Sequence, residues 1–477
     1  MVELRAVRPS RRLTGRPCSR SRNRFRGLPD SFRGLLVVAC LVAVGCQSVP
    51  HRDLGQARIA FAAGQPERAR EVLTKWAGRP GRWNDPAQLD LAILELASGE
   101  PHAAERRLRK LRDRFDETPA SDVGREAVSL VTDDTHRRYR PAGYEQVMIR
   151  AMLAVCSLAG DGVDAESYTL QAMAKQAELA RNAEERGLAF TGDDFRPIAV
   201  APYLRGVVRE ATHRDYDDAA RAYQLVSHVR PQFLPVREDL ERAGRGVHSA
   251  PGHGVLYLVA CVGRGPQLRE VTAPTTSAAL TLASAFVADQ QRARPRPGRP
   301  GEPVLPNIAS VKVPEVVIPP SGTAAVSVHI DGRLWGATQT LTDVGELARR
   351  QCEIEMPWTI ARAVARRVTK ETTIRAARDQ LGISGTAGGL VQFAAATAWS
   401  AGEQADTRCW GLLPREVQVL RAEIPVGVRR LALTPVGPSG GGRGPTRSVD
   451  VTIEDGRNQY LVVFAADAHL QVTGAAQ

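Results

Sequence analysis

Residues that could catalyse a reaction or bind a metal are few in this chain of 477 residues, and their spacing is unfavourable. His248 and His253, two of only nine His, flank a glycine-containing bend and have no acidic partner at metal-ligand spacing. A solvated loop is therefore expected for both. The acidic pair Asp217-Asp218 stands where a helix is predicted to begin, and it would stabilise the helix dipole there. We predict no catalytic residue, no metal site and no cofactor.

Motifs that carry known chemistry are absent from the sequence. It contains no P-loop, no HExxH, no GxSxG and no EF-hand loop. Trp358, Trp399 and Trp410 could line a ligand groove, but large aromatic residues of this kind are expected in the core. The sequence therefore predicts a protein that is not an enzyme.

Cys46 is the cysteine with the clearest chemical context. Arg-rich residues 1–33 precede an apolar run at 34–44, and Gly45 stands directly before the thiol. The apolar run is too short for a membrane-spanning helix, which needs roughly 20 residues. A cleaved export signal has this three-part organisation, so we predict a signal peptide at 1–45.

The small residues before Cys46 resemble the lipobox of bacterial lipoproteins, although Ala43 stands where leucine is commonest. The resemblance implies that the chain is cut before Cys46 and that its thiol carries lipid. Because Gln47 follows instead of aspartate, it also implies an outer-membrane lipoprotein facing the periplasm, with the lipid as its membrane contact. A plain signal peptide and a short anchor helix are the alternatives.

Four further cysteines follow Cys46 in the predicted mature chain. Cys156 and Cys261 lie in apolar runs and are expected to be small core residues. Cys352 and Cys409 lie in more polar segments near aromatic residues. In an oxidising compartment, these two are the candidates for a disulfide.

The net charge of +12 does not indicate nucleic-acid binding. Ten Arg and two acidic residues lie within 1–45, a surplus of eight, which leaves +4 on the rest of the chain. A run of basic residues at 106–114 is partly offset by acidic neighbours and is expected to be a solvated helix face. A strip that docks an anionic polymer is the alternative. We predict no nucleic-acid partner.

A glycine, proline, alanine and leucine pattern recurs in the N-terminal half at an offset of 35 residues. Its two copies are Gly64, Pro66, Ala69 and Leu73, and Gly99, Pro101, Ala104 and Leu108. Glycine ends one helix in a left-handed turn, and proline begins the next helix. Alanine allows close helix crossing, and the leucine four residues later shares its face. The pattern predicts stacked helical hairpins.

A third copy and a fourth, weaker copy follow. One contains Tyr216, Ala219 and Tyr223, and the other begins at Gly160. The four copies resemble the tetratricopeptide repeat, and an irregular α-bundle is the alternative. The resemblance implies a repeat domain at 46–250. The predicted packing residues are Gly64, Ala69, Gly99, Ala104, Tyr216, Ala219 and Tyr223.

Residues 251–477 are predicted to form a β-rich, sandwich-like domain. Residues 254–262 are continuously apolar and read as a buried strand, and shorter alternating segments follow at 309–318, 323–330, 417–423, 429–435, 448–453 and 458–465. Asp331-Gly332 and Asp455-Gly456 are typical of tight hairpin turns. A helical insert is expected at 357–400, beginning at Pro357. The predicted fold class is thus α+β and multidomain.

Several motifs resemble those of an uncharacterised family of tetratricopeptide-containing bacterial lipoproteins. They are Tyr139-Arg140-Pro141 with Tyr144-Glu145, Arg196-Pro197 with Pro202-Tyr203, Gly263-x-Gly265-Pro266, and the segment at 405–414. Cys409 departs from the small polar residue expected within that last segment. The resemblance implies architecture and compartment but no activity.

The lipid anchor and the repeats together predict a protein-binding scaffold or adaptor of the cell envelope. Concave faces of stacked helical hairpins commonly bind peptides or helices, which implies an envelope protein partner of unknown identity. An enzyme acting on cell-wall polymer and a small-ligand sensor are the alternatives. A buried polar cluster in a cleft would favour the enzyme, and a closed apolar pocket between the halves would favour the sensor.

Overall fold

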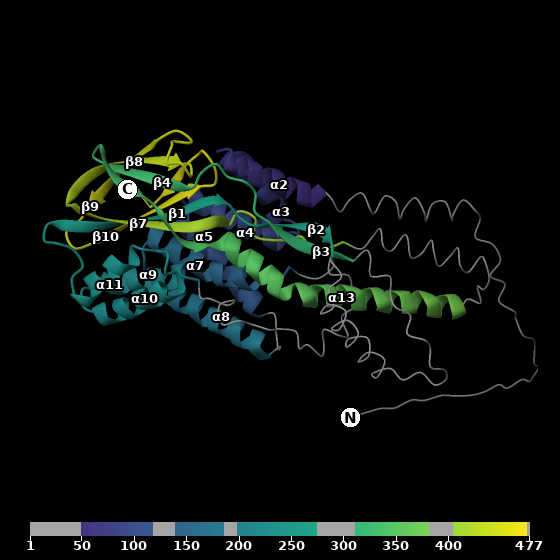
Figure 1. The fold of residues 1–477 in the computed structure, drawn as a ribbon. Helices are drawn as coiled ribbons and strands as arrows, with labels where there is room; N and C mark the ends of the chain where they lie inside the picture. The colour runs from purple at the N-terminus through teal and green to yellow at the C-terminus, as the bar shows by residue number, and fades with distance from the viewer. Residues whose placement is uncertain (1–48, 118–138, 186–197, 274–310, 381–403, 475–477) are drawn as a thin grey trace, which may run out of the picture. The chain divides into compact units, whose positions relative to one another are not determined.

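The computed structural model describes residues 49–117, 139–185, 198–273, 311–380 and 404–474, with side chains of the long helix described as far as 364. The predicted signal peptide, Cys46 and the Arg196-Pro197 motif lie outside these ranges. So does the second part of the predicted insert, at 386–400. Residues Val49–Gln477 form one packed unit (Figure 1).

Among the described residues, the N-terminal part contains four antiparallel helical hairpins, as the repeat pattern predicted. The hairpins are α2 (Val49–Ala62) with α3 (Pro66–Ala77), α4 (Asn84–Ala97) with α5 (Pro101–Asp116), α7 (Gly143–Ala159) with α8 (Ala165–Glu185), and α9 (Val200–Glu210) with α10 (Tyr216–Val229); α11 (Val236–Gly244) follows. Gly64 and Gly99 have φ of +74° and +83°, and a proline opens the next helix in both hairpins. These left-handed turns explain why glycine recurs at this repeat position.

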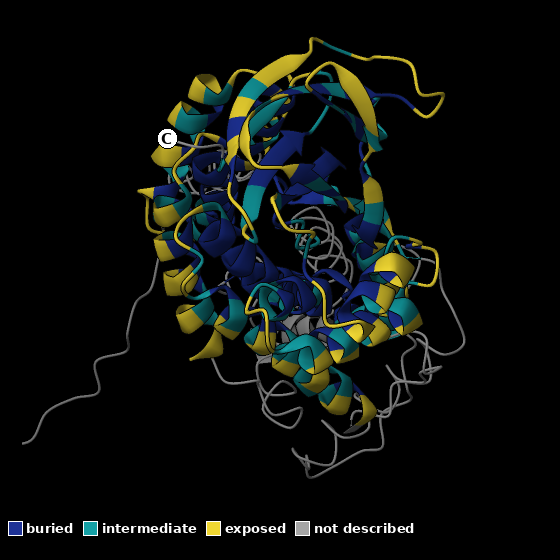
Figure 2. Cartoon of the chain, turned by 90° about the vertical axis from the view of Figure 1, so that its left-hand side faces the viewer, coloured by how far each residue is buried: buried dark blue, intermediate teal, exposed yellow. Residues whose placement is uncertain are grey.

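The two helices of a hairpin differ in burial. Almost every residue of α4 and α7 is buried. Along α3, by contrast, only Ala69, Leu73 and Ala77 are buried, at the spacing of one helix face. In the second and third hairpins the first helix is therefore internal, whereas α3 of the first hairpin lies outside. Figure 2 shows this contrast between buried inner and exposed outer helices.

The described residues of the C-terminal part form two larger sheets and a small one, in agreement with the predicted sheet-rich region. The five-stranded sheet has the order β11 (Gln471–Thr473), β10 (Asn458–Ala465), β1 (His253–Arg264), β7 (Pro414–Pro425), β6 (Gln339–Asp343). The four-stranded sheet has the order β5 (Arg333–Ala337), β4 (Ala325–Ile330), β8 (Gly427–Val436), β9 (Arg447–Ile453). The strands β2 (Gln267–Thr272) and β3 (Lys312–Val317) form the small sheet. Strand β1 runs parallel to β10 and antiparallel to β7.

Strand β1 is buried on both faces. Tyr257 and Val259 belong to the core that contains the helices, whereas Leu256 and Leu258 belong to the core shared with the four-stranded sheet. Successive strand residues point to opposite faces, so one apolar run serves both cores. The five-stranded sheet is thus the middle layer between the helices and the second sheet. The change from helices to strands near residue 250 is consequently not a boundary between separate cores.

The helical insert begins earlier than predicted. Helix α13 spans Val344–Gln380, so Pro357 lies inside it instead of opening it. Proline is common in the first turn of a helix, which favoured the later start. The true start has its own cap, because Asp343 Oδ1 accepts the Glu346 N–H at 2.8 Å. The short strands β2, β5, β6 and β11 were not predicted.

Candidate functional site

The inner face of the helical repeats is occupied by residues 408–414 of the same chain. Trp410 is completely buried, and its Nε1–H donates to the Leu89 carbonyl of α4 at 3.0 Å. Cys409 and Leu413 are also buried. Trp410 is therefore a core residue, as expected. The inner face, which we predicted to bind a partner peptide, is covered by a segment of the same chain.

Three side chains from the first helices of three successive hairpins hold this segment. Asp90 Oδ1 accepts the Leu412 N–H at 2.8 Å, and Glu145 Oε1 accepts the Trp410 N–H at 2.7 Å. Arg58 Nη2 donates to the Cys409 carbonyl at 3.0 Å. Because these contacts are made to backbone N–H and C=O groups, they do not depend on the side chains of the docked segment. This arrangement is suited to holding a peptide and includes no acid, base or nucleophile aimed at open space.

The charges of this site are buried and paired. Arg58 Nε donates to Asp90 Oδ2 at 2.9 Å, and both side chains are almost fully inaccessible. Although burial lowers it, the pKa of the Arg58 guanidinium is raised overall by the charge of Asp90. Burial raises the pKa of Glu145, and hydrogen bonds from the Tyr139 hydroxyl and the Trp410 N–H oppose that rise. The ion pair stabilises the docked segment and is unsuited to proton transfer.

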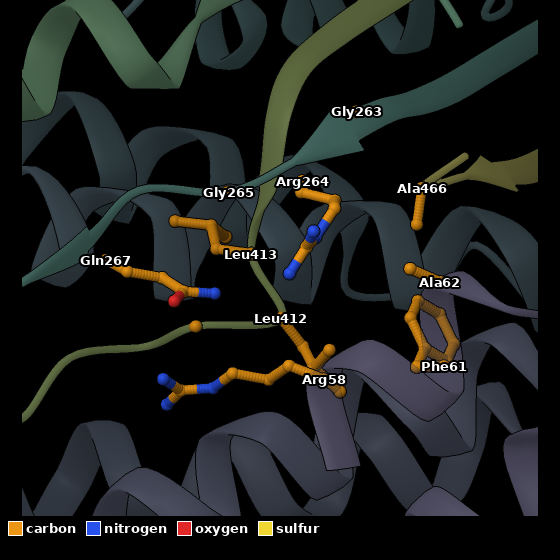
Figure 3. Close-up of a pocket in the computed structure, with 11 residues that line it drawn as sticks. Arg58, Phe61, Ala62, Gly263, Arg264, Gly265, Gln267, Leu412, Leu413 and Ala466 are labelled. Atoms are coloured by element: carbon orange, nitrogen blue, oxygen red, sulfur yellow. The ribbon is translucent and has the colours of Figure 1, made fainter. Parts of the chain in front are cut away.

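A small pocket lies beside the docked segment, between α2 and the loop after β1 (Figure 3). Arg264 points into it, and Phe61 and Leu412 supply apolar walls. Its volume is about 20 Å³, which is room for about one water. A Cβ atom on Gly265 would lie 1.8 Å from the Leu413 carbonyl oxygen, so glycine permits the close chain approach here. The pocket is too small for an organic ligand.

A second buried polar cluster ties the fourth hairpin together. Arg242 Nη2 donates to Glu210 Oε2 at 2.9 Å and to Asp239 Oδ1 at 2.7 Å. The Tyr223 hydroxyl donates to Glu210 Oε2 at 2.8 Å. Because these groups connect α9, α10 and α11, their arrangement is that of a structural ion-pair network. Neither of the two pockets described here includes any of them.

His248 is not on a solvated loop, contrary to our expectation. Its side chain is buried, and Nε2 lies 2.8 Å from Asn458 Oδ1 on β10. The His213 ring lies 4.6 Å away, centroid to centroid. Burial lowers the pKa of His248. The sequence could not reveal this position, because it depends on the docking of the segment before β1 against β10.

The basic run on α5 pairs with neighbouring helices. Arg107 bonds to Glu95 of α4, Arg114 contacts Asp85, and Arg109 Nη2 lies 3.0 Å from Asp164 in the α7–α8 turn. These contacts stabilise the stacking of hairpins. They favour the expected structural role over a docking strip for anionic polymer.

The predicted disulfide is not formed. Cys352 and Cys409 both carry free thiols, as do Cys156 and Cys261. Cys409 is buried against Arg58, whereas Cys352 lies next to the Pro314 carbonyl of β3. The two cysteines have similar neighbours in the sequence, and that similarity does not show whether they lie close together in the fold. Burial raises the pKa of Cys409 to about 11, which keeps its thiol protonated and unreactive.

Six of the seven predicted packing residues lie at hairpin turns or at buried positions. Ala69, Ala104 and Ala219 are completely buried, and Tyr223 is buried against Gly206 of α9. The exception is Tyr216, which is only partly buried. Ala222, three residues after Ala219, is buried as well. The fourth hairpin therefore packs α10 over a broader face than the repeat pattern indicates.

One apolar pocket opens between helices α7, α8, α9 and α10. Its volume is about 170 Å³. The lining residues are Val147, Ala172, Met173, Gln176, Ala177, Ala180, Ile198, Ala201, Pro202 and Leu225. Gln176 Oε1 is inaccessible to solvent and has no hydrogen-bond partner among the described residues. The pocket lies within the helical part and not between the two halves, where a sensor pocket was expected.

Within the described ranges, no group of His, Cys, Asp and Glu residues could hold a metal ion. Over the same ranges, no helix has the length and apolar character needed to cross a bilayer.

The side chains that hold the docked segment were not predicted as site residues. Asp90 interrupts the apolar run of α4, and a charge within such a run is a usable signal of a buried partner. Tyr144-Glu145 and the segment at 405–414 were singled out separately as motifs. The structure brings them together, through the Glu145 contact with Trp410.

Comparison with known proteins is consistent with this architecture. Residues 60–121, from the end of α2 to just beyond α5, match the family model of the tetratricopeptide repeat. No curated protein and no solved structure matches the chain. The chain therefore contains tetratricopeptide repeats, and domains built from these repeats generally bind protein partners.

Proposed function

We propose that this protein is a bacterial envelope lipoprotein that acts as a protein-binding scaffold, anchored in the outer membrane through lipid on Cys46 and facing the periplasm. The observation that carries the proposal is the position of Cys46 at the end of an export-signal pattern, just before the first helical hairpin. A scaffold needs a binding surface and a fixed location, and these two features would supply them. No catalytic role is included in the proposal.

The partner would bind the outer side of the repeats. Residues 408–414 and the five-stranded sheet already pack on the inner face. The apolar pocket between α7 and α10 is open to the surface, and its size suits one apolar side chain.

The anchor is tested with Cys46→Ala in the full chain. Lipidation predicts that the variant leaves the membrane fraction and becomes soluble in the periplasm. A variant that stays in membranes with residues 34–44 still attached would contradict the anchor and indicate an uncleaved helix instead.

The binding surface is tested with a matched pair of substitutions on α8. Ala177 lines the pocket and is exposed, whereas Ala174 is exposed on the same helix and does not line it. Ala177→Arg should block the pocket and abolish recovery of the partner in affinity purification from envelopes. Ala174→Arg should leave recovery unchanged. Equal recovery with both variants would exclude the pocket as the binding site.

A small-ligand sensor is the second candidate, because the same pocket could take a free apolar molecule. In that case the Ala177→Arg variant would lose thermal stabilisation by an added apolar ligand without losing any protein partner.

A further inference from the structure

The described part of the chain begins close to the predicted lipidation site. Helix α2 starts at Val49, three residues after Cys46. An extended chain spans at most about 3.6 Å per residue, so the three residues after Cys46 can carry a lipid on it no further than roughly 11 Å from the first turn of α2. If Cys46 carries lipid, as the proposed function on which this inference rests requires, this end of the first hairpin is held at the bilayer surface.

The end of α3 and the α3–α4 loop lie at this same end of the hairpin. Trp76 Nε1–H donates to Asp53 Oδ2 in the first turns of α2 at 3.1 Å. Lys75 Nζ lies 3.4 Å from the same carboxylate. The rings of His51 and Trp83 lie 5.8 Å apart, centroid to centroid. Any membrane that holds Cys46 is therefore also close to these residues.

This end is basic and aromatic. We define the anchor-proximal face as Arg52, Lys75, Trp76, Arg79 and Arg82. Arg52, Lys75 and Arg79 are exposed, and Trp76 is half-buried. The cations of Lys75 and Arg79 lie 5.6 and 5.4 Å from the Trp76 ring centroid. Long cationic side chains beside an indole ring are typical of surfaces at lipid headgroups.

Two of the cations of this face, Arg52 and Arg79, are not neutralised by residues in the described ranges. Asp53 is paired with Lys75, and Asp85 is paired with Arg114. Arg52 and Arg79 have no ion pair with any residue in the described ranges. Two exposed guanidinium groups therefore remain available to an anionic surface.

We propose that the anchor-proximal face binds the surface of an anionic phospholipid bilayer. The lipid on Cys46 brings the face to the membrane, and Arg52 and Arg79 contact phosphate groups while Trp76 lies at headgroup depth. The two attachments together fix the orientation of the repeats, so that α8 and its pocket are presented in one direction instead of rotating freely about a single tether.

The test uses the unlipidated fragment 49–477, which contains every core of the packed unit. Co-sedimentation is measured with vesicles of phosphatidylglycerol and phosphatidylethanolamine and with vesicles of phosphatidylcholine. Each cation near an anionic surface contributes about fivefold in affinity, so Arg52→Ala with Arg79→Ala should weaken binding to the anionic vesicles by roughly 25-fold. High salt should have a similar effect.

The control pair is Arg214→Ala with Arg457→Ala, which removes two exposed guanidinium groups from other loops. It should bind like the parent, and thermal melts should show all variants folded. Equal loss with both pairs, or no preference for anionic vesicles, would overturn the proposal. Because the fragment carries no lipid, failure here is distinguishable from failure of the Cys46 anchor.

Discussion

Substitution of Asp90 by alanine should be among the most damaging single changes in the helical part. Asp90 is completely buried and accepts hydrogen bonds from Arg58 on α2 and from the Leu412 N–H of the docked segment. Removing the carboxylate leaves a buried guanidinium without its counter-charge and a buried N–H without an acceptor. Breaking a buried pair in this way costs roughly 3–5 kcal/mol of unfolding free energy.

The unfolding free energy is measured by urea denaturation followed by circular dichroism on the fragment 49–477. A loss of about 3–5 kcal/mol is a large share of the total stability of an ordinary domain, so the transition midpoint should fall markedly. Asp113→Ala is the control, because that carboxylate is half-exposed and paired with Arg112 on the same helix. A surface pair of this kind contributes about 0–1 kcal/mol.

A double variant separates the charge from the packing. Arg58→Met with Asp90→Leu removes both charges and keeps apolar volume, so it should recover much of the stability lost in Asp90→Ala. If Asp90→Ala instead costs less than about 1 kcal/mol, within the range of a surface pair, residues 408–414 are not held in the groove as described here.

Three further changes test other parts of the fold. Ala219→Leu should overpack the α9–α10 hairpin and cost about 1–3 kcal/mol in urea unfolding, whereas Ala174→Leu on the exposed face of α8 should be nearly neutral. Gly99→Ala should cost about 1–2 kcal/mol for its left-handed backbone. Gly64→Ala should cost more than Gly99→Ala, because its Cβ would also lie 2.7 Å from a histidine ring of the C-terminal part. Equal costs would place that ring elsewhere. The lowered pKa of His248 means that the unfolded chain binds its proton more readily, so stability should fall as pH falls below about 6.5. His248→Gln should reduce the difference in urea midpoint between pH 8 and pH 5.5. An unchanged difference would show that protonation of His248 is not the cause of the lost stability.

Elements with a strong local pattern were predictable from the sequence. The turns at Gly64 and Gly99 need a left-handed backbone, and the run at 254–262 needs burial on both faces, so each pattern has one straightforward structural solution. The start of α13 was misplaced because Pro357 carries a stronger local signal than the Asp343 cap.

The candidate site was less predictable, because it depends on tertiary contacts across long stretches of chain. Arg58 and Cys409 are 351 residues apart in sequence yet share a hydrogen bond, and no periodicity reports such a contact. The occupied inner face and the free thiols of Cys352 and Cys409 follow from the same docking. The sequence pattern of helical hairpins predicts that the hairpins stack. It does not show which segment of the chain packs on the inner face of the stack.

The central claim is that a protein partner binds the outer pocket of the repeats while the inner face stays closed. Site-specific photo-crosslinking in intact cells tests it most directly, with a photoreactive residue placed at Ala177 on the pocket rim or at Ala174 on the same helix. The claim predicts one discrete crosslinked species from position 177 and none from position 174. Absence of any species from 177, or equal crosslinking from both positions, would contradict it.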